Sequence, residues 1–442
     1  MRRLLAYRDI RIYLAGQLFS LFGDSILWLA MGVWVKTLTG SNAQAGLVFF
    51  FFTAPSLLAP ASGLLADRVR RRPLLIATNA LTAMAVLALL AVNGRGQVWV
   101  VDAVMFAYGL SYILLGPAQS ALLTVMVPAD LLPDANGALR TAQESLRLIG
   151  PLVGAGLFVA VGAHVIAIID AATFAFPVIS LLLLHVREPD PRPASGRWAE
   201  QLSAGARHIW RTVELRHVIA AGAVTTTVFG FAETISYAIA GNGLHRPAAF
   251  VGVLAAVQGA GAVTGGLTAA PLVRRLGEGR LIGVGMLVAA AGAALEIPPL
   301  LPSVLAGDIV FGAAIPWLVV GLISLAQRVT PLELQGRVYA AIELLVTTPQ
   351  TISIALGAAL ITVAGYQTLL LAMAAVIAMA AAYLLTRPEQ WHAARPLIRT
   401  WRSPAGDGQP HSADGQPHSG DGDPYSGDGD PYSVEPEHTD AI

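Results

Sequence analysis

Residues 98–126 read VWVVDAVMFAYGLSYILLGPAQSALLTVM, and this stretch decides the class of the fold. It carries a single charged residue, Asp102, and exceeds the roughly 20 residues that a helix needs to cross a lipid bilayer. Bilayer lipid offers no hydrogen-bond partners, so the backbone N–H and C=O groups of such a segment must be satisfied within a helix or a closed barrel. The stretch therefore predicts a membrane-spanning helix.

Similar apolar stretches recur along most of the chain. Of its 442 residues, 55% are hydrophobic and 13% are charged, whereas soluble proteins carry about 25% charged residues. This composition excludes an ordinary globular enzyme. We predict an all-α membrane protein with twelve transmembrane helices. The predicted spans are 13–35, 43–65, 74–93, 98–126, 138–162, 163–185, 217–240, 249–273, 281–298, 303–327, 338–364 and 366–386.

The basic residues predict the orientation of these spans. The N-terminus is basic like a signal peptide, but a long apolar run without an A-x-A pattern follows it, so we expect an uncleaved first span. Placing the N-terminus in the cytoplasm puts 25 of the 28 Lys and Arg residues inside. Only Lys36, Arg95 and Arg246 remain outside, as the positive-inside rule expects. Both termini are therefore predicted to be cytoplasmic.

The chain divides into four parts. Two six-helix halves, 1–186 and 217–386, flank a polar linker at 187–216 with an amphipathic helical segment. A short internal match, with Glu144 aligned to Glu343, suggests that the halves are pseudo-symmetric. The remaining tail, 387–442, contains four tandem heptads at 406–433, and their Gly, Pro, Asp and Ser content predicts disorder.

Two carboxyl groups lie deep inside predicted spans. Asp24 is at the midpoint of the first span, and Glu233 lies about two thirds across the seventh, the corresponding span of the second half. A charge at the bilayer centre costs at least about 2.5–3.5 kcal/mol, so it usually faces a bundle interior or a cavity. Burial disfavours the charged form of a carboxyl group, which allows proton exchange near neutral pH. We expect both to couple proton and substrate movement; helix-packing carboxyls satisfied by neighbours are the alternative.

Other acidic side chains in the spans carry weaker signals. Four lie nearer the outer ends, where solvation is easier: Asp102, Asp170, Glu296 and Asp308. Glu144 lies one turn from Arg140 and Arg147, and Glu343 lies beside Arg337. A separation of one turn lets Glu144 interact with either arginine along a helix face, and we interpret Glu144 and Glu343 as packing or gating charges.

The segment after the second span reads GLLADRVRRR, residues 63–72. It resembles motif A of the major facilitator superfamily, a loop of the form G-x-L-A-D-R-x-G-R-R, with Arg70 at the second glycine. The resemblance implies a gating latch in which Asp67 pairs with arginines across the inner helix ends; a positive-inside loop with one incidental acid is the alternative. The residues carried over are Gly63, Asp67, Arg68, Arg71 and Arg72.

Three further segments are similar to the drug-exporter branch of this superfamily. Gly150, Pro151 and Gly154 in the fifth span resemble its motif C, although Ala155 replaces one glycine of that motif and Leu146 another. Residues 115–118 (LGPA) and 22–24 (FGD) are similar to exporters of siderophores and macrolides. The fourth span lacks the arginine of motif B, and the second-half copy of motif A is degraded. The resemblance covers about residues 8–386 and implies a bacterial cytoplasmic membrane protein.

The resemblance and the intramembrane acids together predict a secondary active transporter and not an enzyme. It would export a small organic molecule (a drug, antibiotic or siderophore-like metabolite) in exchange for protons, by alternating access. An uptake permease or a lipid flippase of the same fold is an alternative, and a membrane enzyme or sensor a remote one. Aromatic rings in the cavity would suit a hydrophobic or cationic compound. Besides the two acids, the candidate lining is Gln17, Trp28, Tyr108, Tyr112, Gln119, Phe229 and Tyr237.

Other site chemistries lack their sequence signals. The net charge is zero and the chain has no cysteine, so nothing indicates nucleic-acid binding, disulfides or thiol-bound metals. No G-x-x-x-x-G-K-[ST] loop is present, so energy must come from a gradient or a separate subunit. The histidines near spans 6 and 7 lie at helix ends, which disfavours haem binding. We expect a monomer without metal or cofactor, whose partners are the substrate, protons and the lipid bilayer.

Overall fold

The computed structural model describes residues 7–59, 69–128, 131–185 and 198–391, and this part of the chain is helical throughout, without strands. The first helices are α1 (Arg8–Thr39), α2 (Asn42–Thr53), η2 (Ala54–Leu58), α4 (Arg71–Leu87), η3 (Ala88–Ala91), η4 (Arg95–Gln97), α5 (Val98–Met126), α6 (Leu132–Thr173) and α7 (Ala175–Leu183). The remaining helices are α8 (Trp198–Arg211), α9 (Val213–Phe229), α10 (Phe231–Ala238), η6 (Ile239–Gly243), η7 (Ala248–Phe250), α11 (Val251–Leu276), α12 (Glu278–Leu295), α13 (Leu301–Val329), α14 (Leu332–Leu360), α15 (Tyr366–Leu385) and η8 (Pro388–Trp391).

Ten segments of the described residues are long and apolar enough to cross a membrane. The predicted span 43–65 corresponds to the shorter apolar segment Asn42–Leu58, and its end lies outside the described residues. The predicted spans 138–162 and 163–185 fall on α6 and α7, which form one apolar segment, Ile149–Leu183. Inside α6, Gly162 has φ 77° and ψ 170°, a non-helical conformation, so the helix kinks where we predict the boundary between two spans.

Local sequence explains the tight turn between α1 and α2. Gly40 ends α1 in the left-handed conformation (φ 72°), which favours glycine, and its N–H donates to the carbonyl oxygen of Lys36. Ser41 then caps α2, because its hydroxyl accepts a hydrogen bond from the N–H of Gln44. The motif Gly40-Ser41 therefore reverses the chain within two residues and brings α2 back alongside α1.

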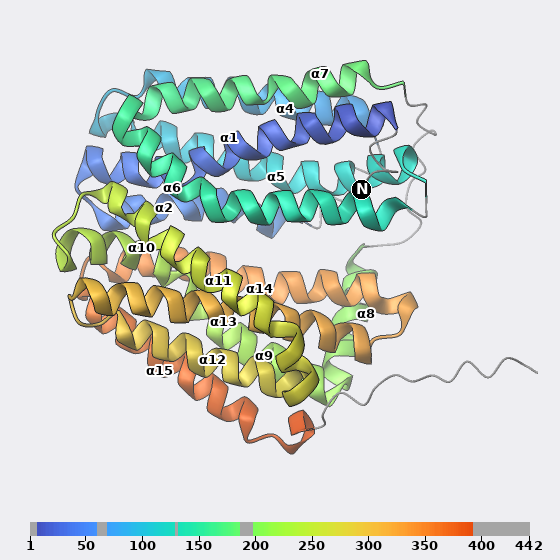
Figure 1. The fold of residues 1–442 in the computed structure, drawn as a ribbon, viewed down its shortest axis with the longest axis vertical. Helices are drawn as coiled ribbons and strands as arrows, with labels where there is room; N and C mark the ends of the chain where they lie inside the picture. Colours follow the sequence, from blue (N-terminus) through green and yellow to red (C-terminus); the bar gives the residue numbers. More distant parts are fainter. Residues whose placement is uncertain (1–6, 60–68, 129–130, 186–197, 392–442) are drawn as a thin grey trace, which may run out of the picture. The chain divides into compact units, whose positions relative to one another are not determined.

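The helices pack in two sequential groups, which Figure 1 allows the reader to follow by colour. In the first group, α1 packs against α6 and α7, and α5 packs against α2 and α4. In the second group, α13 packs against α11 and α12, and α15 packs against α9 and α12. The two groups meet where α2 contacts α10 and α14, and where α6 contacts α11.

A hydrophobic cluster joins the two groups, and we call it the inter-group cluster. Its buried members are Leu29, Val33, Ala45, Phe49, Ala155, Tyr237, Ala240, Val251 and Ile354. Close by, the Asn42 side chain donates to the Asn242 side chain across 3.1 Å. Gly46 contributes to the fit, since a Cβ there would lie 3.0 Å from the Cβ of Thr234 and 3.3 Å from its Cα.

The helices α11 and α13 are in backbone contact. A Cβ on Gly261 would lie 2.9 Å from the Ile309 backbone, and one on Gly265 would lie 2.8 Å from the Ala313 carbonyl carbon. The Trp317 indole N–H also donates to the carbonyl oxygen of Gly265 at 3.0 Å. Small residues permit this approach, which is common between helices in membranes.

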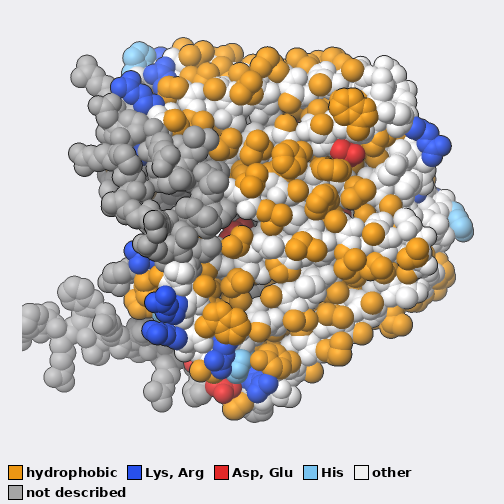
Figure 2. Space-filling view, turned by 180° about the vertical axis from the view of Figure 1, so that it is seen from behind, with side chains coloured by type: hydrophobic (Ala, Val, Ile, Leu, Met, Phe, Trp, Pro, Cys, Tyr) orange, Lys and Arg blue, Asp and Glu red, His pale blue; other side chains and the backbone are white. Residues whose placement is uncertain are grey.

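The outer surface of the bundle is apolar. Figure 2 shows hydrophobic side chains across the middle of one face, with most of its Lys and Arg side chains at one margin. Large side chains such as Val363 (83% exposed), Leu267 (76%) and Val159 (72%) have no protein cover. An apolar band with charges at its margin fits a bilayer and not water.

The predicted amphipathic segment of the linker forms α8. Its residue Ile209 is buried in the core of the second group, and a Cβ on Gly205 would lie 2.6 Å from the Arg337 carbonyl carbon of α14. Trp210 and Arg211 remain exposed. One side of α8 therefore packs on protein.

Candidate functional site

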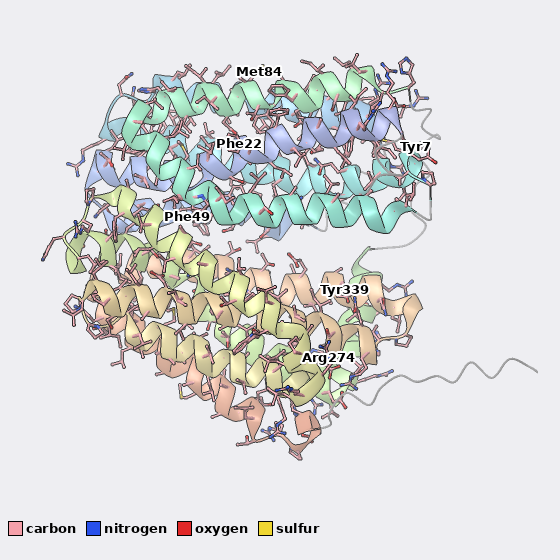
Figure 3. All side chains as sticks on the ribbon, viewed as in Figure 1. Tyr7, Phe22, Phe49, Met84, Arg274 and Tyr339 are labelled. Atoms are coloured by element: carbon pink, nitrogen blue, oxygen red, sulfur yellow. The ribbon has the colours of Figure 1, made fainter. Side chains whose placement is uncertain are left out.

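Two adjacent cavities lie inside the bundle. The larger, about 710 Å³, is enclosed by residues of α1, α2, α6, α10, α11 and α13. The smaller, about 400 Å³, is enclosed by α1, α2, α5, α6, α10 and α14. The two share a wall made of Trp28, Phe49, Pro151 and Glu233. Both therefore lie where the two helix groups meet, and Figure 3 labels Phe49 at that junction.

Asp24 lies on the wall of the smaller cavity. The Tyr108 hydroxyl, from α5, donates a hydrogen bond to its Oδ1 atom. Tyr112 lines the same cavity one turn further along α5. The structure thus brings three sequence-predicted residues to one place, and the hydroxyl donor stabilises negative charge on Asp24.

Asp170 lies directly behind Asp24. It is 1% exposed, and the residue before Asp24, Gly23, leaves room for it: a Cβ on Gly23 would lie 2.6 Å from the Asp170 Oδ1 atom. Asp170 interacts electrostatically with Asp24 and with Tyr108. The sequence analysis assigns Asp170 a weaker signal because of its position near the outer end of the predicted span. The packing of α6 against α1 at the level of Asp24 is not visible in the sequence.

Glu233 lines both cavities, and Tyr237, one turn later on α10, lines the larger one. Across the larger cavity stands Asp308 of α13, whose Oδ2 atom has no hydrogen-bond partner among the described residues. Asp308 interacts in turn with Glu296, which lies against Gly307. The larger cavity thus has carboxyl groups on two sides, with aromatic rings on a third.

The aromatic wall consists of stacked and tilted rings. Trp28 and Phe49 have ring centroids 4.6 Å apart, and Phe49 and Tyr237 have centroids 6.4 Å apart. Phe52 lies 6.0 Å from both Tyr108 and Tyr112. Faces of aromatic rings attract cations and apolar groups, so this wall complements a cationic or hydrophobic molecule.

The residues similar to exporter motif C hold α6 against α1. A Cβ on Gly150 would lie 3.0 Å from the Ser25 carbonyl oxygen, and one on Gly154 would lie 2.5 Å from the Ile26 carbonyl oxygen. Pro151 lines both cavities. This segment therefore packs against the backbone of α1 at the level of its cavity-lining residues.

The residues similar to motif A are only partly within the described structure. Gly63, Asp67 and Arg68 lie outside the described residues. Arg71 and Arg72 open α4, and the Arg72 guanidinium donates to the carbonyl oxygen of Leu182 at 3.1 Å. The predicted latch stays a prediction.

Other predicted lining residues lie away from both cavities. Gln17 is bonded to Gln119, because the Gln119 amide donates to the Gln17 side-chain carbonyl oxygen at 3.0 Å, while the Gln17 amide nitrogen has no partner among the described residues. Phe229 stacks on Phe311 at 5.0 Å in the core of the second group. Several lining residues carried no sequence signal of their own, namely Phe49, Phe52, Gln143, Gln258 and Gln350.

A charge network closes one end of the second group. Arg328, at the end of α13, donates to Glu278 of α12 at 3.1 Å and to Glu214 of α9 at 3.0 Å. Gln390 also donates to the carbonyl oxygen of Glu214. Three helix ends are thus tied by one arginine.

Within the described part of the chain, no cluster of three or more His, Asp or Glu side chains is suited to hold a metal ion. A bundle of membrane-spanning helices around internal cavities with buried carboxyl groups defines a polytopic transporter. The sequence profile of the Major Facilitator Superfamily matches residues 13–241, more than half of the chain. The chain belongs to that superfamily and is a multi-pass membrane transporter, not an enzyme.

Curated relatives are similar at moderate identity. The uncharacterized MFS-type transporter YfiS of Bacillus subtilis (strain 168) is 24% identical over 370 residues, covering 80% of this chain and 87% of that protein. Macrolide efflux protein A of Streptococcus pyogenes is 26% identical over 175 residues, covering 39% of this chain and 43% of that protein.

Solved structures of transporters have the same fold. A bacterial homologue of the iron transporter ferroportin, in its inward-facing state, superposes with a TM-score of 0.65 at 16% identity, covering 86% of this chain and 98% of that one. The nucleoside transporter NupG gives a TM-score of 0.67 at 14% identity, covering 85% and 99%. At these identities the likeness concerns the fold alone.

Proposed function

We propose that the protein exports a small organic molecule from a bacterial cytoplasmic membrane in exchange for protons. The observation that carries the proposal is the pair of cavities between the helix groups, in which carboxyl groups face an aromatic wall. Carboxyl groups in this setting can bind either a proton or a cationic substrate, which is the competition that an antiporter needs. The similarity to macrolide efflux protein A supports export over uptake or lipid flipping.

The proposed architecture is twelve spans in two six-helix halves, with both termini in the cytoplasm. Splitting the apolar segment Ile149–Leu183 at Gly162 and counting the segment Asn42–Leu58 supports that number. In this orientation the inter-group cluster lies on the outer side, so the described conformation is closed to the outside. Transport then requires the cluster to separate, with the halves rocking about the cavities.

The proton gradient is adequate for such work. At a membrane potential of about 150 mV, one inward proton supplies about 3.5 kcal/mol. Since about 1.4 kcal/mol corresponds to a tenfold ratio, this supports an outward concentration ratio of a few hundred.

The test is efflux of ethidium, a fluorescent organic cation, from an efflux-deficient bacterium that expresses the chain. Wild type is compared with Asp24→Asn and, as the control, Asp9→Asn in the first turn of α1, at matched membrane abundance. We expect wild-type and Asp9→Asn efflux that a protonophore abolishes, and at least a tenfold loss in Asp24→Asn. Efflux that survives the protonophore, or that survives in Asp24→Asn, contradicts proton exchange at this site.

If wild type leaves ethidium untouched, the same strains are challenged with a macrolide antibiotic, because a relative carries that specificity in its name. Accumulation of the compound inside the cell, in place of exclusion, would indicate an uptake permease. Loss of activity upon closing lateral access from the bilayer would indicate a flippase.

A further inference from the structure

Asp170 has no described hydrogen-bond partner. Both of its carboxyl oxygens are buried without one, and the side chain is 1% exposed. Buried polar groups in folded proteins are almost always hydrogen-bonded, so each exception requires an explanation. An ionised carboxylate in such a place would be an uncompensated charge, which costs several kcal/mol.

The nearest hydroxyl cannot relieve that charge. Thr173 lies with Asp170 around the space left by Gly23, but the Thr173 hydroxyl donates to the backbone carbonyl oxygen of Asp170 at 2.7 Å. No arginine or lysine forms an ion pair with either Asp24 or Asp170 within the described residues. The surroundings of Asp170 therefore offer nothing that stabilises a negative charge.

Asp24 has the opposite surroundings. It accepts a hydrogen bond from the Tyr108 hydroxyl, and it borders a cavity. The charged form of Asp24 therefore has a hydrogen-bond donor and is not enclosed by apolar side chains on every side. Two neighbouring carboxyl groups repel each other when both are ionised, so such a pair tends to retain one proton. The difference between the surroundings of Asp24 and those of Asp170 decides which of the two carboxyl groups carries that proton.

We propose that Asp24 and Asp170 hold one proton between them at rest, and that this proton sits on Asp170 while Asp24 is ionised and faces the substrate. The inference deepens the proposed proton exchange, on which it rests. It also divides between two side chains the roles that the sequence analysis combines in Asp24: Asp24 attracts the cationic substrate, and Asp170 stores the proton.

The remaining groups around the pair are few. Tyr108 of α5 is hydrogen-bonded to Asp24 and interacts with Asp170 only electrostatically, and Tyr112 and Glu233 line the smaller cavity together with Asp24. His164, earlier on α6, is held by the carbonyl oxygen of Val92 at 2.8 Å and by an edge contact with Trp34. Other titratable groups on these helices, such as Asp102 of α5 and Tyr13 of α1, do not line the smaller cavity.

The arrangement gives a direct exchange. A cation that binds beside Asp24 compensates its negative charge, so Asp170 can ionise without facing an uncompensated neighbour. Because Asp170 lines neither cavity, its proton leaves by way of Asp24: the Asp170 O–H bond breaks, its electron pair stays on Asp170, and Asp24 takes up the proton and passes it on into the cavity that it borders. One bound cation therefore releases one proton, and departure of the cation restores it.

Infrared spectroscopy of the purified chain in lipid nanodiscs at neutral pH tests where the proton sits. The signal is the carbonyl stretch of a protonated carboxylic acid, identified by its shift in heavy water. The spectra compared are those of wild type, Asp170→Asn, Asp24→Asn and the control Asp9→Asn. We expect Asp170→Asn to lose the amplitude of one protonated carboxyl relative to wild type, and Asp24→Asn and Asp9→Asn to keep it.

Loss of the signal in Asp24→Asn with retention in Asp170→Asn would place the proton on Asp24 and overturn the inference, as would full retention in both. If Asp170→Asn does not fold, Asp170→Glu should keep the signal at a shifted frequency; an unshifted signal then refutes the assignment. The measurement uses resting protein without substrate. A failed efflux assay would therefore count against the proposed function and leave this result independent.

Discussion

The contact between Gly46 and Thr234 yields a quantitative prediction for Gly46→Ala. The new methyl group would lie 3.0 Å from the Thr234 Cβ and 3.3 Å from its Cα, closer than ordinary contact. The Thr234 hydroxyl lies closer still, and the position of the Cβ is fixed by the backbone of α10, so α2 and α10 must move apart. Overpacking of this kind costs about 1–3 kcal/mol. The cost falls only on the state in which the two helices touch.

A cost confined to one state shifts the population toward the other. At about 1.4 kcal/mol per tenfold, the fraction of molecules whose inter-group cluster is open should rise by about 5-fold to 140-fold. The chain has no cysteine, so a single introduced cysteine is the only thiol of the protein that a maleimide can label. Ala240 is fully buried in the cluster, and Ala240→Cys is the reporter for a membrane-impermeant maleimide applied outside the cell.

The labelling rate of Ala240→Cys follows the open fraction when opening and closing are fast relative to the reaction. We expect it to rise by that factor in the Gly46→Ala background. Gly156→Ala is the matched control, because nothing lies within 4 Å of a Cβ at that glycine of α6. Thr234→Gly combined with Gly46→Ala should restore slow labelling, since it removes the opposing Cβ. An unchanged rate in folded Gly46→Ala, or an equal rise in Gly156→Ala, would refute the reasoning.

Three further predictions concern other contacts. Gly23→Ala should abolish efflux and cost about 1–3 kcal/mol of stability, because its methyl group would lie 2.6 Å from the Asp170 Oδ1 atom. Normal efflux and normal thermal stability in this variant would contradict the packing between α1 and α6. Arg328→Ala should destabilise the protein by about 1–3 kcal/mol, because it leaves the Glu278 side chain, which is 5% exposed, without its partner. The measurement is the unfolding temperature in detergent. Glu214→Gln changes the more exposed partner of Arg328 and should lower that temperature less. Deleting residues 403–442 should leave membrane abundance and efflux unchanged, because the composition of that segment cannot bury a core; loss of efflux at matched abundance would show that the tail has a role.

Hydrophobicity and turn residues predict much of this fold from sequence. Apolar length alone locates the helices, because lipid imposes one backbone solution, and Gly40 and Ser41 locate the first turn. Gly162 marks the kink in α6, since its positive φ favours glycine. The end of the predicted span 43–65 and the motif A residues Gly63, Asp67 and Arg68 lie outside the described residues, so their predictions stay open.

The site was only partly predictable, because lining a cavity depends on the neighbouring helices. Trp28 and Tyr237 do border a cavity. In contrast, Gln17 is hydrogen-bonded to Gln119, and the ring of Phe229 stacks on that of Phe311. A polar residue inside a span signals that it needs a partner, but the sequence does not say whether that partner is another side chain or a substrate. Asp170 was underestimated for the same reason, since its neighbour Asp24 comes from a helix far away in sequence.

The glycine contacts between α11 and α13 have a mechanical consequence. The backbones of these helices touch at Gly261 and Gly265, so sliding or rotation of one helix past the other would produce a clash. The two helices should therefore move together as one rigid body. Gln258 on one helix and Asp308 on the other border the larger cavity, so any swing carries both together. A joint movement of α11 and α13 would therefore change the distance from this wall of the cavity to the opposite wall, which α1, α2 and α10 form.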